Sequence, residues 1–265
     1  MMLFDRVVEL KVGDSDITKL DITFEIEKDL TPEPNHCHVE IFNLGAQNRA
    51  TLSKYKLVPV ILKAGYRDQV GVIFQGDMLS CTHIKEGPTW KTVLASGDGA
   101  LAIQTARINK SFAKGTAVKS IIEEIAKQLK LPCDGALKQL EILSEKLARG
   151  FCVKGNAMDE LSRILNQHGI SVSIQNNSLQ LLKNEESLVG KVINLTADSG
   201  LKGSPQMGGD KMLQVQAVLM PNLLPGSKIH IQSSAFNGFA TIQSVRFSGA
   251  NFGDEWRTEV LAKRN

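Results

Sequence analysis

Two short clusters hold the side chains best suited to metal binding, His36-Cys37-His38 and Cys81-Thr82-His83. Alternate residues of a β-strand point to one face, so each cluster could present two nitrogen or sulfur ligands together. Four such ligands would suit zinc if the two strands paired with a suitable register. A simpler interpretation turns Cys37 inward and leaves both histidines at the exposed start of a strand. Because dedicated zinc sites show paired short spacings, we predict no metal site.

Carboxylates are numerous, but acid–base catalysis needs two of them in one cleft. The adjacent candidates are Glu123 with Glu124, Glu185 with Glu186, and Asp14 with Asp16. The first pair lies on a helical pattern and points in two directions, the second lies in a polar loop, and the third shares a turn. Each is more simply a solvated surface group, so the sequence predicts no catalytic residue.

Motifs for a nucleophile or for phosphate binding are missing. The sequence has no G-x-S-x-G motif, and Cys152 stands between Phe151 and Val153 as a strand residue does. Gly97-Asp98-Gly99 lacks the Lys-Ser/Thr ending of a Walker loop, and Gly208-Gly209 precedes no helical pattern. We expect both glycine segments to be turns, and we predict that no cofactor binds.

Composition excludes several classes of protein. The 265 residues are 42% hydrophobic and 22% charged, which is typical of a globular chain and not of collagen, coiled coil or disorder. The 31 Lys and Arg residues against 28 Asp and Glu give a net charge of +3, too small a surplus to indicate a specific nucleic-acid partner. Aromatic residues make up only 5% of the chain, so stacking on single-stranded nucleic acid has little support.

The sequence carries no signal for a membrane or for export. Its apolar runs are far shorter than the ~20 residues of a membrane-spanning helix, and its N-terminus lacks the pattern of a signal peptide. The four cysteines, Cys37, Cys81, Cys133 and Cys152, show no CxxC spacing. We therefore expect a protein of the cytoplasm with no membrane partner, in which the four reduced cysteines are small buried apolar residues.

Residues 1–100 predict a β domain. Apolar and polar residues alternate with a period of two, the pattern of half-buried strands. The expected strands are residues 7–12, 22–27, 38–42, 58–66, 70–78 and 89–96. Pro32 and Pro34 mark a loop at residues 30–35. Short strands at this spacing favour a small barrel or a sandwich.

Residues 101–188 change to a helical period. An apolar stripe predicts one amphipathic helix with Thr116 as its N-cap and Leu131-Pro132 after its end. The stripe is Val118, Ile121, Ile122, Ile125, Ala126 and Leu129. A second stripe, Ala157, Leu161, Ile164 and Leu165, ends before Gly169. Residues 137–147 fit either a weaker helix or a loop.

Two further features belong to this middle segment. Strands are expected at residues 170–175 and 179–183, joined by the tight turn Asn176-Asn177-Ser178. Lys114-Gly115-Thr116-Ala117 and Lys154-Gly155-Asn156-Ala157 form a weak repeat before the two helices. This repeat fits a duplication and a shared helix-start chemistry about equally well.

Residues 189–265 return to β. The expected strands are residues 192–195, 212–219, 228–232, 238–247 and 256–261, with Gly203-Ser204-Pro205 as a turn. The fold class is therefore β-rich α+β, with two small β-barrel domains flanking a mixed α/β segment. The predicted domains are residues 1–100, 101–188 and 189–265.

An ordered series of segments resembles the baseplate hub proteins of tailed bacteriophages. The series begins at residues 22–28, passes Pro34-Asn35 to a strand ending Ile41-Phe42-Asn43-Leu44, and continues through residues 48–52. It goes on through residues 62–66, 73–77, 114–116, 203–205, 215–226 and 247–259. The likeness therefore covers nearly the whole chain in the right order.

This resemblance implies a structural protein of the virion tail baseplate, assembled in the host cytoplasm, with no catalysis. Hubs of this kind carry two similar barrels per chain and assemble as homotrimers. Three such chains present six similar surfaces, which fit a sixfold tail tube on one side and a threefold central spike on the other. The implied partners are therefore the tail tube protein, the spike, the tape-measure protein and the other baseplate (wedge) proteins.

Two alternatives stay open from the sequence. One is a tail-tip enzyme that degrades cell walls, which needs a placed carboxylate pair such as one drawn from Glu123, Glu124, Asp159 and Glu160. The sequence stops ten residues after Glu255, so we expect no fused lytic domain. The other alternative is a barrel that binds oligosaccharide or single-stranded nucleic acid.

Overall fold

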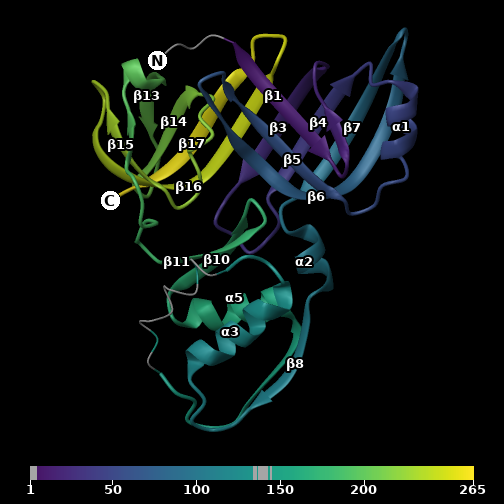
Figure 1. The fold of residues 1–265 in the computed structure, drawn as a ribbon. Coiled ribbons are helices and arrows are strands. Elements are labelled where there is room, and N and C mark those ends of the chain that lie inside the picture. The colour runs from purple at the N-terminus through teal and green to yellow at the C-terminus, as the bar shows by residue number, and fades with distance from the viewer. Residues whose placement is uncertain (1–4, 134–135, 137–142, 144) are drawn as a thin grey trace. The chain divides into compact units, whose positions relative to one another are not determined.

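The computed structural model describes residues 5–133, 136, 143 and 145–265 (Figure 1). Contacts between residues divide it into two compact units. The first unit comprises Met1–Asp29, Asn35–Asp98 and Ser187–Asn265, and the second comprises Leu30–Pro34 and Gly99–Glu186. None of the described helices is long and apolar enough to cross a membrane.

The N-terminal segment of the first unit forms seven strands and one helix. They are β1 (Arg6–Val12), β2 (Ser15–Ile17), β3 (Asp21–Lys28), β4 (His36–Phe42), α1 (Ala46–Leu52), β5 (Pro59–Tyr66), β6 (Gln69–Glu86) and β7 (Thr89–Gly97). Burial alternates along them as the period-two pattern predicts, with Ile22, Phe24 and Ile26 buried and Glu25 and Glu27 exposed. The six strands expected here are confirmed; β2 is too short to show a period.

The C-terminal segment of the first unit adds six strands and one short helix. They are β12 (Ile193–Leu195), η2 (Ala197–Ser199), β13 (Leu201–Met207), β14 (Met212–Val218), β15 (Lys228–Gln232), β16 (Asn237–Ala250) and β17 (Trp256–Arg264). The prediction of a turn at Gly203-Ser204-Pro205 is wrong. These residues form an irregularity inside β13, between Lys202 and Gln206, which lets an edge strand contain a proline.

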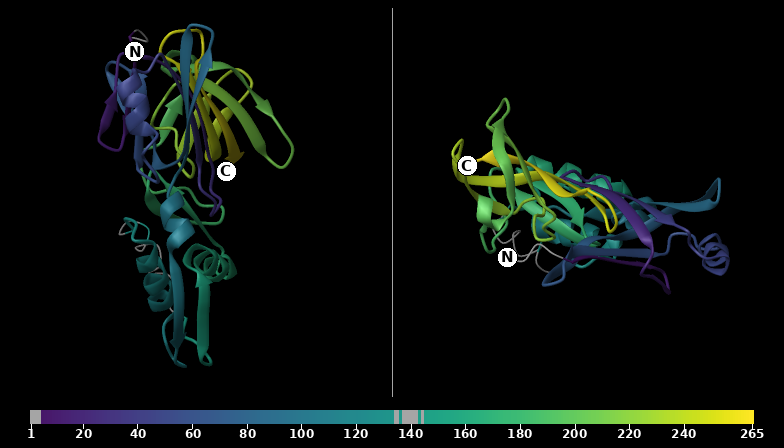
Figure 2. Two further views of the ribbon diagram at one scale, coloured as in Figure 1. Left: turned by 90° about the vertical axis from the view of Figure 1, so that its right-hand side faces the viewer. Right: turned by 90° about the horizontal axis from the view of Figure 1, so that it is seen from above.

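All these strands belong to one sheet, ordered β13-β14-β17-β16-β3-β4-β7-β6-β5-β1-β2, with β15 also on β16 and β12 on β15. The yellow C-terminal strands lie beside the purple N-terminal strands (Figures 1 and 2). The two closed barrels that the sequence predicts are not confirmed, because β13 and β2 each pair on one side only and leave the sheet open. The domain limits at residues 100 and 188 stay a prediction.

One face of this sheet packs into a core shared by both segments. Trp256 of β17 is 2% exposed and meets the rings of Phe24 and Tyr66 edge-on, at centroid distances of 5.9 and 6.2 Å. A Cβ at Gly249 would lie 2.4 Å from the Phe24 ring, so this close approach of β16 to β3 requires glycine.

The second unit is a small α/β unit. It contains α2 (Ala100–Thr105), β8 (Arg107–Phe112), α3 (Val118–Leu129), β9 (Phe151–Asn156), α5 (Ala157–Gln167), β10 (Ile170–Gln175) and β11 (Ser178–Lys183). Both predicted helices are confirmed, and their apolar stripes form its core. Both Asn176 and Asn177 have positive φ, as the tight turn requires.

The start of α3 differs from the expectation. Its N-cap is Ala117, while the Thr116 hydroxyl donates to the Ala113 carbonyl. The Val118 amide instead donates to the Glu145 carbonyl, a distant partner that a local pattern cannot show. At α5 the Asn156 side chain caps the helix, so the two halves of the weak repeat begin their helices differently. Most of the weaker helix candidate at residues 137–147 lies outside the described residues.

Candidate functional site: the sheet of the first unit

The residues that could have formed a zinc site do not converge. Val39 of β4 lies opposite Leu94 of β7, and Leu94 lies opposite Cys81 of β6, so Cys81 and His83 point to the core side. His36 and His38 are exposed on the other face. Within the described residues, no group of three or more His, Cys, Asp or Glu side chains could hold a metal ion.

His83 connects α1 to the sheet. Its Nδ1 lies 2.9 Å from the Thr92 hydroxyl, and its Nε2 lies 3.0 Å from the Ser53 hydroxyl and 3.1 Å from the Arg49 carbonyl. Burial lowers the pKa of His83, which favours the neutral ring. These contacts give His83 a structural role at the second half of β6.

The candidate carboxylates are dispersed. Glu124 lies 3.0 Å from the Lys110 ammonium, whose hydrogen bond lowers the pKa of Glu124. Glu186 pairs with Lys183, and Glu160 pairs with Arg163. Asp14 is exposed on the turn between β1 and β2, Asp16 is exposed within β2, and Glu123 is half-buried on α3. The pairings described keep these carboxylates at separate places rather than in one catalytic cleft.

The cysteine candidate lies on a strand, and the two glycine segments lie at turns. Cys152 lies on β9 opposite Ser111 of β8, as the strand interpretation expects. The expectation of buried cysteines holds for Cys37 and is wrong for Cys152, whose side chain is exposed because it points away from the core on its strand. Asp98 and Gly99 form the turn between β7 and α2, and Gly208-Gly209 lies in the loop between β13 and β14. Both glycine segments are therefore turns, as predicted.

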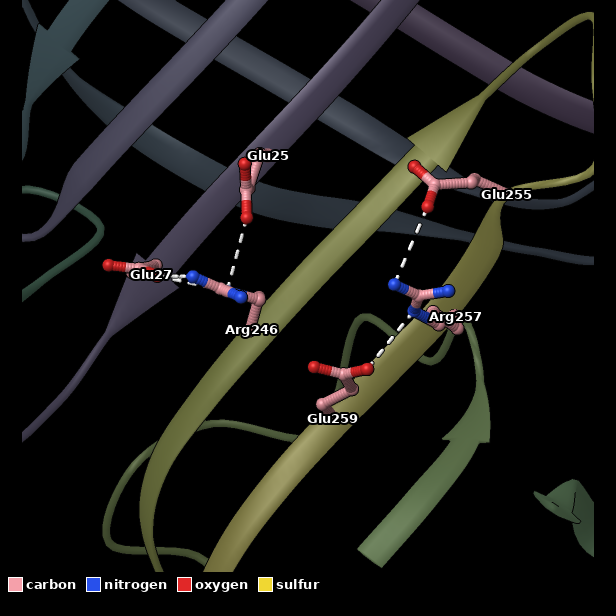
Figure 3. Close-up of polar contacts among 6 residues, drawn as sticks. All are labelled: Glu25, Glu27, Arg246, Glu255, Arg257 and Glu259. Atoms are coloured by element: carbon pink, nitrogen blue, oxygen red, sulfur yellow. Dashed lines mark hydrogen bonds and ion pairs between the residues drawn. The ribbon is translucent and has the colours of Figure 1, made fainter.

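A charged ladder crosses three strands on the exposed face of the sheet (Figure 3). Arg246 of β16 reaches across to Glu27 and to Glu25 of β3, the latter at 3.1 Å. Arg257 of β17 pairs with Glu255 at 3.4 Å and with Glu259 at 3.1 Å. All six side chains are about one-third to three-fifths exposed. Such exposed pairs fix the register of neighbouring strands more than they add stability.

The Arg246 end of the ladder marks the junction between the two segments. Here β16 pairs antiparallel with β3, with Arg246 opposite Glu27 and Phe247 opposite Ile26. Phe247 and Ile26 are fully buried on the core side of this junction. The β16–β3 junction therefore has apolar side chains on its core face and charged side chains on its exposed face. Because a shift of one residue would exchange the two faces, this pattern fixes the register.

A buried polar cluster lies where the chain leaves the first unit. The side chains of Lys28 and Asp98 are fully buried, with Nζ and Oδ2 3.9 Å apart. Asn35 donates to Asp98 at 3.3 Å and accepts from the Asp29 amide at 2.9 Å. Burial lowers the pKa of Lys28 to about 8, against the opposing effect of Asp98. The chain passes from one unit to the other after Asp29, before Asn35 and after Asp98. The cluster therefore joins three ends of the first unit's segments at these crossings.

The same five-strand arrangement occurs twice around the junction. We call β3–β7 the N-terminal motif and β13–β17 the C-terminal motif. In each, the first strand pairs with the second and the second pairs with the fifth. The long fourth strand pairs its first half with the third strand and its second half with the fifth. Each motif is therefore a copy of the other in strand order and direction.

The registers of the two motifs agree residue by residue. Trp90-Lys91-Thr92 of β7 corresponds to Trp256-Arg257-Thr258 of β17, and both threonines are fully buried. In each motif the fourth and fifth strands slip register at the same place, at Met78/Ser80 in β6 and at Ile242/Ser244 in β16. A shared bulge at one position indicates a common backbone design.

The family resemblance implied two similar domains, but sequence reasoning found no residues that mark this repeat. The signal was present, because the chain has only two tryptophans and each is followed by a cation and a threonine. Nothing in the spacing shows that the two segments lie in equivalent strands until the pairing of the sheet is known.

One family model matches nearly the whole chain. The family model described as "Baseplate hub gp41" matches residues 6–260. No curated protein matches the chain. Among solved structures, a 43 kDa tail protein of prophage MuSo2 from Shewanella oneidensis has a TM-score of 0.68 at 10% identity, covering 97% of this chain and 96% of that one.

Two further structures share the fold. A tail protein from Neisseria meningitidis MC58 has a TM-score of 0.66 at 11% identity, covering 99% of this chain and 97% of that one. The E. coli c3393 protein, a component of the type VI secretion system, has a TM-score of 0.64 at 13% identity, covering 97% of this chain and 76% of that one. At these identities the likeness shows the fold alone.

Proposed function

Since the chain belongs to the baseplate hub gp41 family, we propose that three copies form a ring that joins a sixfold tail tube to a threefold central spike. Membership of this family makes the chain a structural protein of the tail baseplate. The ring, its symmetry and its two neighbours are the proposal.

The internal repeat is the observation that carries this proposal. Each chain holds two motifs with one strand order, one direction and one shared bulge. Three chains related by a threefold axis would therefore present six similar motifs around a circle. Such a ring can face a sixfold partner with all six motifs and a threefold partner with one contact per chain.

The structure also supports a mechanical rather than a chemical role. Two of the four carboxylates from which a cell-wall-degrading enzyme would draw its pair are bound to cations, Glu124 to Lys110 and Glu160 to Arg163. We propose that the chain performs no catalysis and that the ring closes a channel and seats the first tube ring. Tape-measure and wedge proteins would be further neighbours in the baseplate, after assembly in the host cytoplasm.

Light scattering coupled to size-exclusion chromatography tests the ring. The expected mass is about 87 kDa, three times the 28.9 kDa of one chain, either alone or after addition of the spike or tube protein. A mass of one chain at all concentrations, with both partners present, would overturn the proposal. A lysis assay on purified peptidoglycan tests the absence of catalysis, and activity lost with Glu124→Gln would contradict it.

A further inference from the structure

Positive charge gathers on the ribbon that β8 and β9 form in the second unit. The two strands pair antiparallel along their whole length and lie side by side (Figure 2). The ribbon and the turns at its end, residues 106–117 and 146–156, contain six of the chain's 31 Lys and Arg residues and none of its 28 Asp and Glu residues. The six are Arg107, Lys110, Lys114, Lys146, Arg149 and Lys154. The small net charge of the whole chain therefore conceals a strong local excess of cations.

The two faces of the ribbon differ in their side chains. The inner face packs against the core of the second unit through Ile108, Phe112, Phe151 and Val153. The outer face carries exposed side chains that alternate with these. They are Arg107, Asn109, Ser111, Cys152 and Lys154. The outer face is thus a polar, cationic surface that contacts solvent.

Four cations of the ribbon have no carboxylate partner among the described residues. Lys114, Arg149 and Lys154 make no ion pair there. Arg107 donates to the neighbouring Ala106 carbonyl at 2.9 Å and likewise makes no ion pair with the described residues.

The nearby carboxylates lie against other groups. Glu124 pairs with Lys110 at 3.0 Å, and Glu145 lies 3.7 Å from His168. The four cations therefore suit an anionic partner from outside the chain.

The outer face lacks the side chains that two kinds of anionic partner need. Binding to an anionic membrane surface also uses apolar side chains that insert among the lipids. Interfaces with a protein partner centre on aromatic or large apolar side chains. Cys152 is the least polar side chain of the outer face, so neither partner fits it well.

Single-stranded nucleic acid fits poorly as well. Proteins that bind single strands stack the bases on exposed aromatic rings. Phe112 and Phe151 pack against the core, with the Lys110 ammonium 5.8 Å from the centre of the first ring and the Arg163 guanidinium 5.5 Å from the centre of the second. These rings are not on the outer face and do not offer a stacking surface there.

Duplex nucleic acid fits the shape and the chemistry of the outer face. The major groove of a duplex is about 12 Å wide and admits a two-stranded β-ribbon. Phosphate oxygens accept hydrogen bonds from Arg, Lys, Asn and Ser side chains. These are the residue types at Arg107, Lys154, Asn109 and Ser111.

We propose that the outer face of the β8–β9 ribbon binds duplex nucleic acid through the phosphate backbone, without sequence preference. Arg107 and Lys154 contact phosphates from the face of the ribbon, and Lys114 and Arg149 contact them from its end. This binding goes beyond the proposed ring and does not depend on it.

Fluorescence anisotropy of a labelled 20-base-pair DNA duplex, titrated with the full chain, tests the proposal. Four phosphate contacts predict a slope of about −3.6 for the logarithm of the binding constant against the logarithm of salt concentration. That slope corresponds to a loss of affinity of about 150-fold between 50 and 200 mM salt. No binding at 50 mM salt would overturn the proposal.

Charge-neutral variants locate the binding surface. Arg107→Gln/Lys154→Gln removes two of the four contacts and should reduce the slope to about −1.8. The control Lys54→Gln/Lys56→Gln removes two exposed lysines of the first unit and should leave the slope unchanged. Thermal melting confirms that both variants are folded. Equal losses of affinity in the two variants would show a general effect of net charge and would overturn the assignment to the ribbon.

Competitors test the class of partner. Unlabelled duplex should displace the labelled duplex at a lower concentration than single-stranded DNA or poly-glutamate of the same total charge. Displacement by poly-glutamate at the same concentration as by duplex would indicate a site for acidic polypeptides and overturn the proposal. Equal displacement by single-stranded DNA would contradict the fit to a duplex groove.

Cys152 gives an independent test of the location. It is exposed on the outer face, whereas Cys133 of the same unit is half-buried. A saturating concentration of duplex should slow alkylation of Cys152 by iodoacetamide several-fold and leave the rate at Cys133 unchanged, as measured by mass spectrometry. An unchanged rate at Cys152 would mean that the duplex binds elsewhere and would overturn the proposal.

Discussion

The two motifs differ in what covers the end of their long strand. In the C-terminal motif, β3 covers β16, and Trp256 is 2% exposed against Phe24 and Tyr66. In the N-terminal motif, the equivalent Trp90 is only half-buried, with the Arg49 guanidinium 4.0 Å above its ring. The same backbone therefore carries a core tryptophan where a neighbouring motif is present and a surface tryptophan where it is not.

The opposite ends of the motifs differ as well. The N-terminal motif ends in the buried Lys28–Asp98 cluster, where the chain passes into the second unit. The corresponding end of β17 reaches Arg264 and Asn265, both exposed. Burying an ion pair is costly. Of the two motifs, the one from which the chain passes into the second unit contains such a pair.

The largest expected effect comes from the covered junction. Phe247→Ala removes a fully buried ring between β16 and β3 and should lower the free energy of unfolding by about 3–5 kcal/mol. The matched change in the N-terminal motif, His83→Ala, removes hydrogen bonds from a half-buried ring and should cost about 1 kcal/mol. Urea denaturation measures both, and equal losses would mean that the two positions are equally covered in the monomer.

The buried ion pair gives the next effect. Lys28→Met leaves Asp98 buried without its cation, and Asp98→Asn leaves Lys28 without its anion, so each should cost about 3 kcal/mol or more. The double variant should be less destabilised than the sum of the two, by at least about 1 kcal/mol. The exposed pair of Lys63 and Glu9, 3.3 Å apart, is the control and should couple by less than about 1 kcal/mol. Additive losses at Lys28 and Asp98 would show that the pair is not coupled.

The ends of the two motifs also differ in their response to pH. Burial lowers the pKa of Lys28 from 10.5 to about 8, so between these values the unfolded chain holds a proton that the folded chain has released. This group therefore makes the protein more stable as pH rises from about 8 towards 10.5. The measurement is the urea midpoint of the wild type minus that of Lys28→Met across this range. A flat difference would contradict a lowered pKa of Lys28.

Local sequence patterns predicted the individual strands and helices better than the order in which the strands pair. The alternation of β3 and the stripe of α3 were sufficient, because each element buries one face of its own. β13 was missed because its irregular Gly203-Ser204-Pro205 has the composition of a turn. The pairing of Arg246 with Glu27 joins residues far apart in the chain, and no local spacing encodes it. The motif of tryptophan, cation and threonine at Trp90 and Trp256 is visible in the sequence. Only the strand registers show that its two copies occupy equivalent positions.

The smallest expected effect tests what the charged ladder contributes. Arg246→Ala removes exposed pairs with Glu25 and Glu27, so it should cost only about 1 kcal/mol or less, and less still at high salt. The equivalent position in the N-terminal motif is Thr82, and Thr82→Ala is the matched control with no charge to lose. If Arg246→Ala cost as much as Phe247→Ala in urea denaturation, the junction would depend on its charged face. A small, salt-sensitive loss would show that the buried contact of Phe247 with Ile26 contributes most of the stability of the junction. Salt screens exposed ion pairs but does not weaken apolar burial in this way.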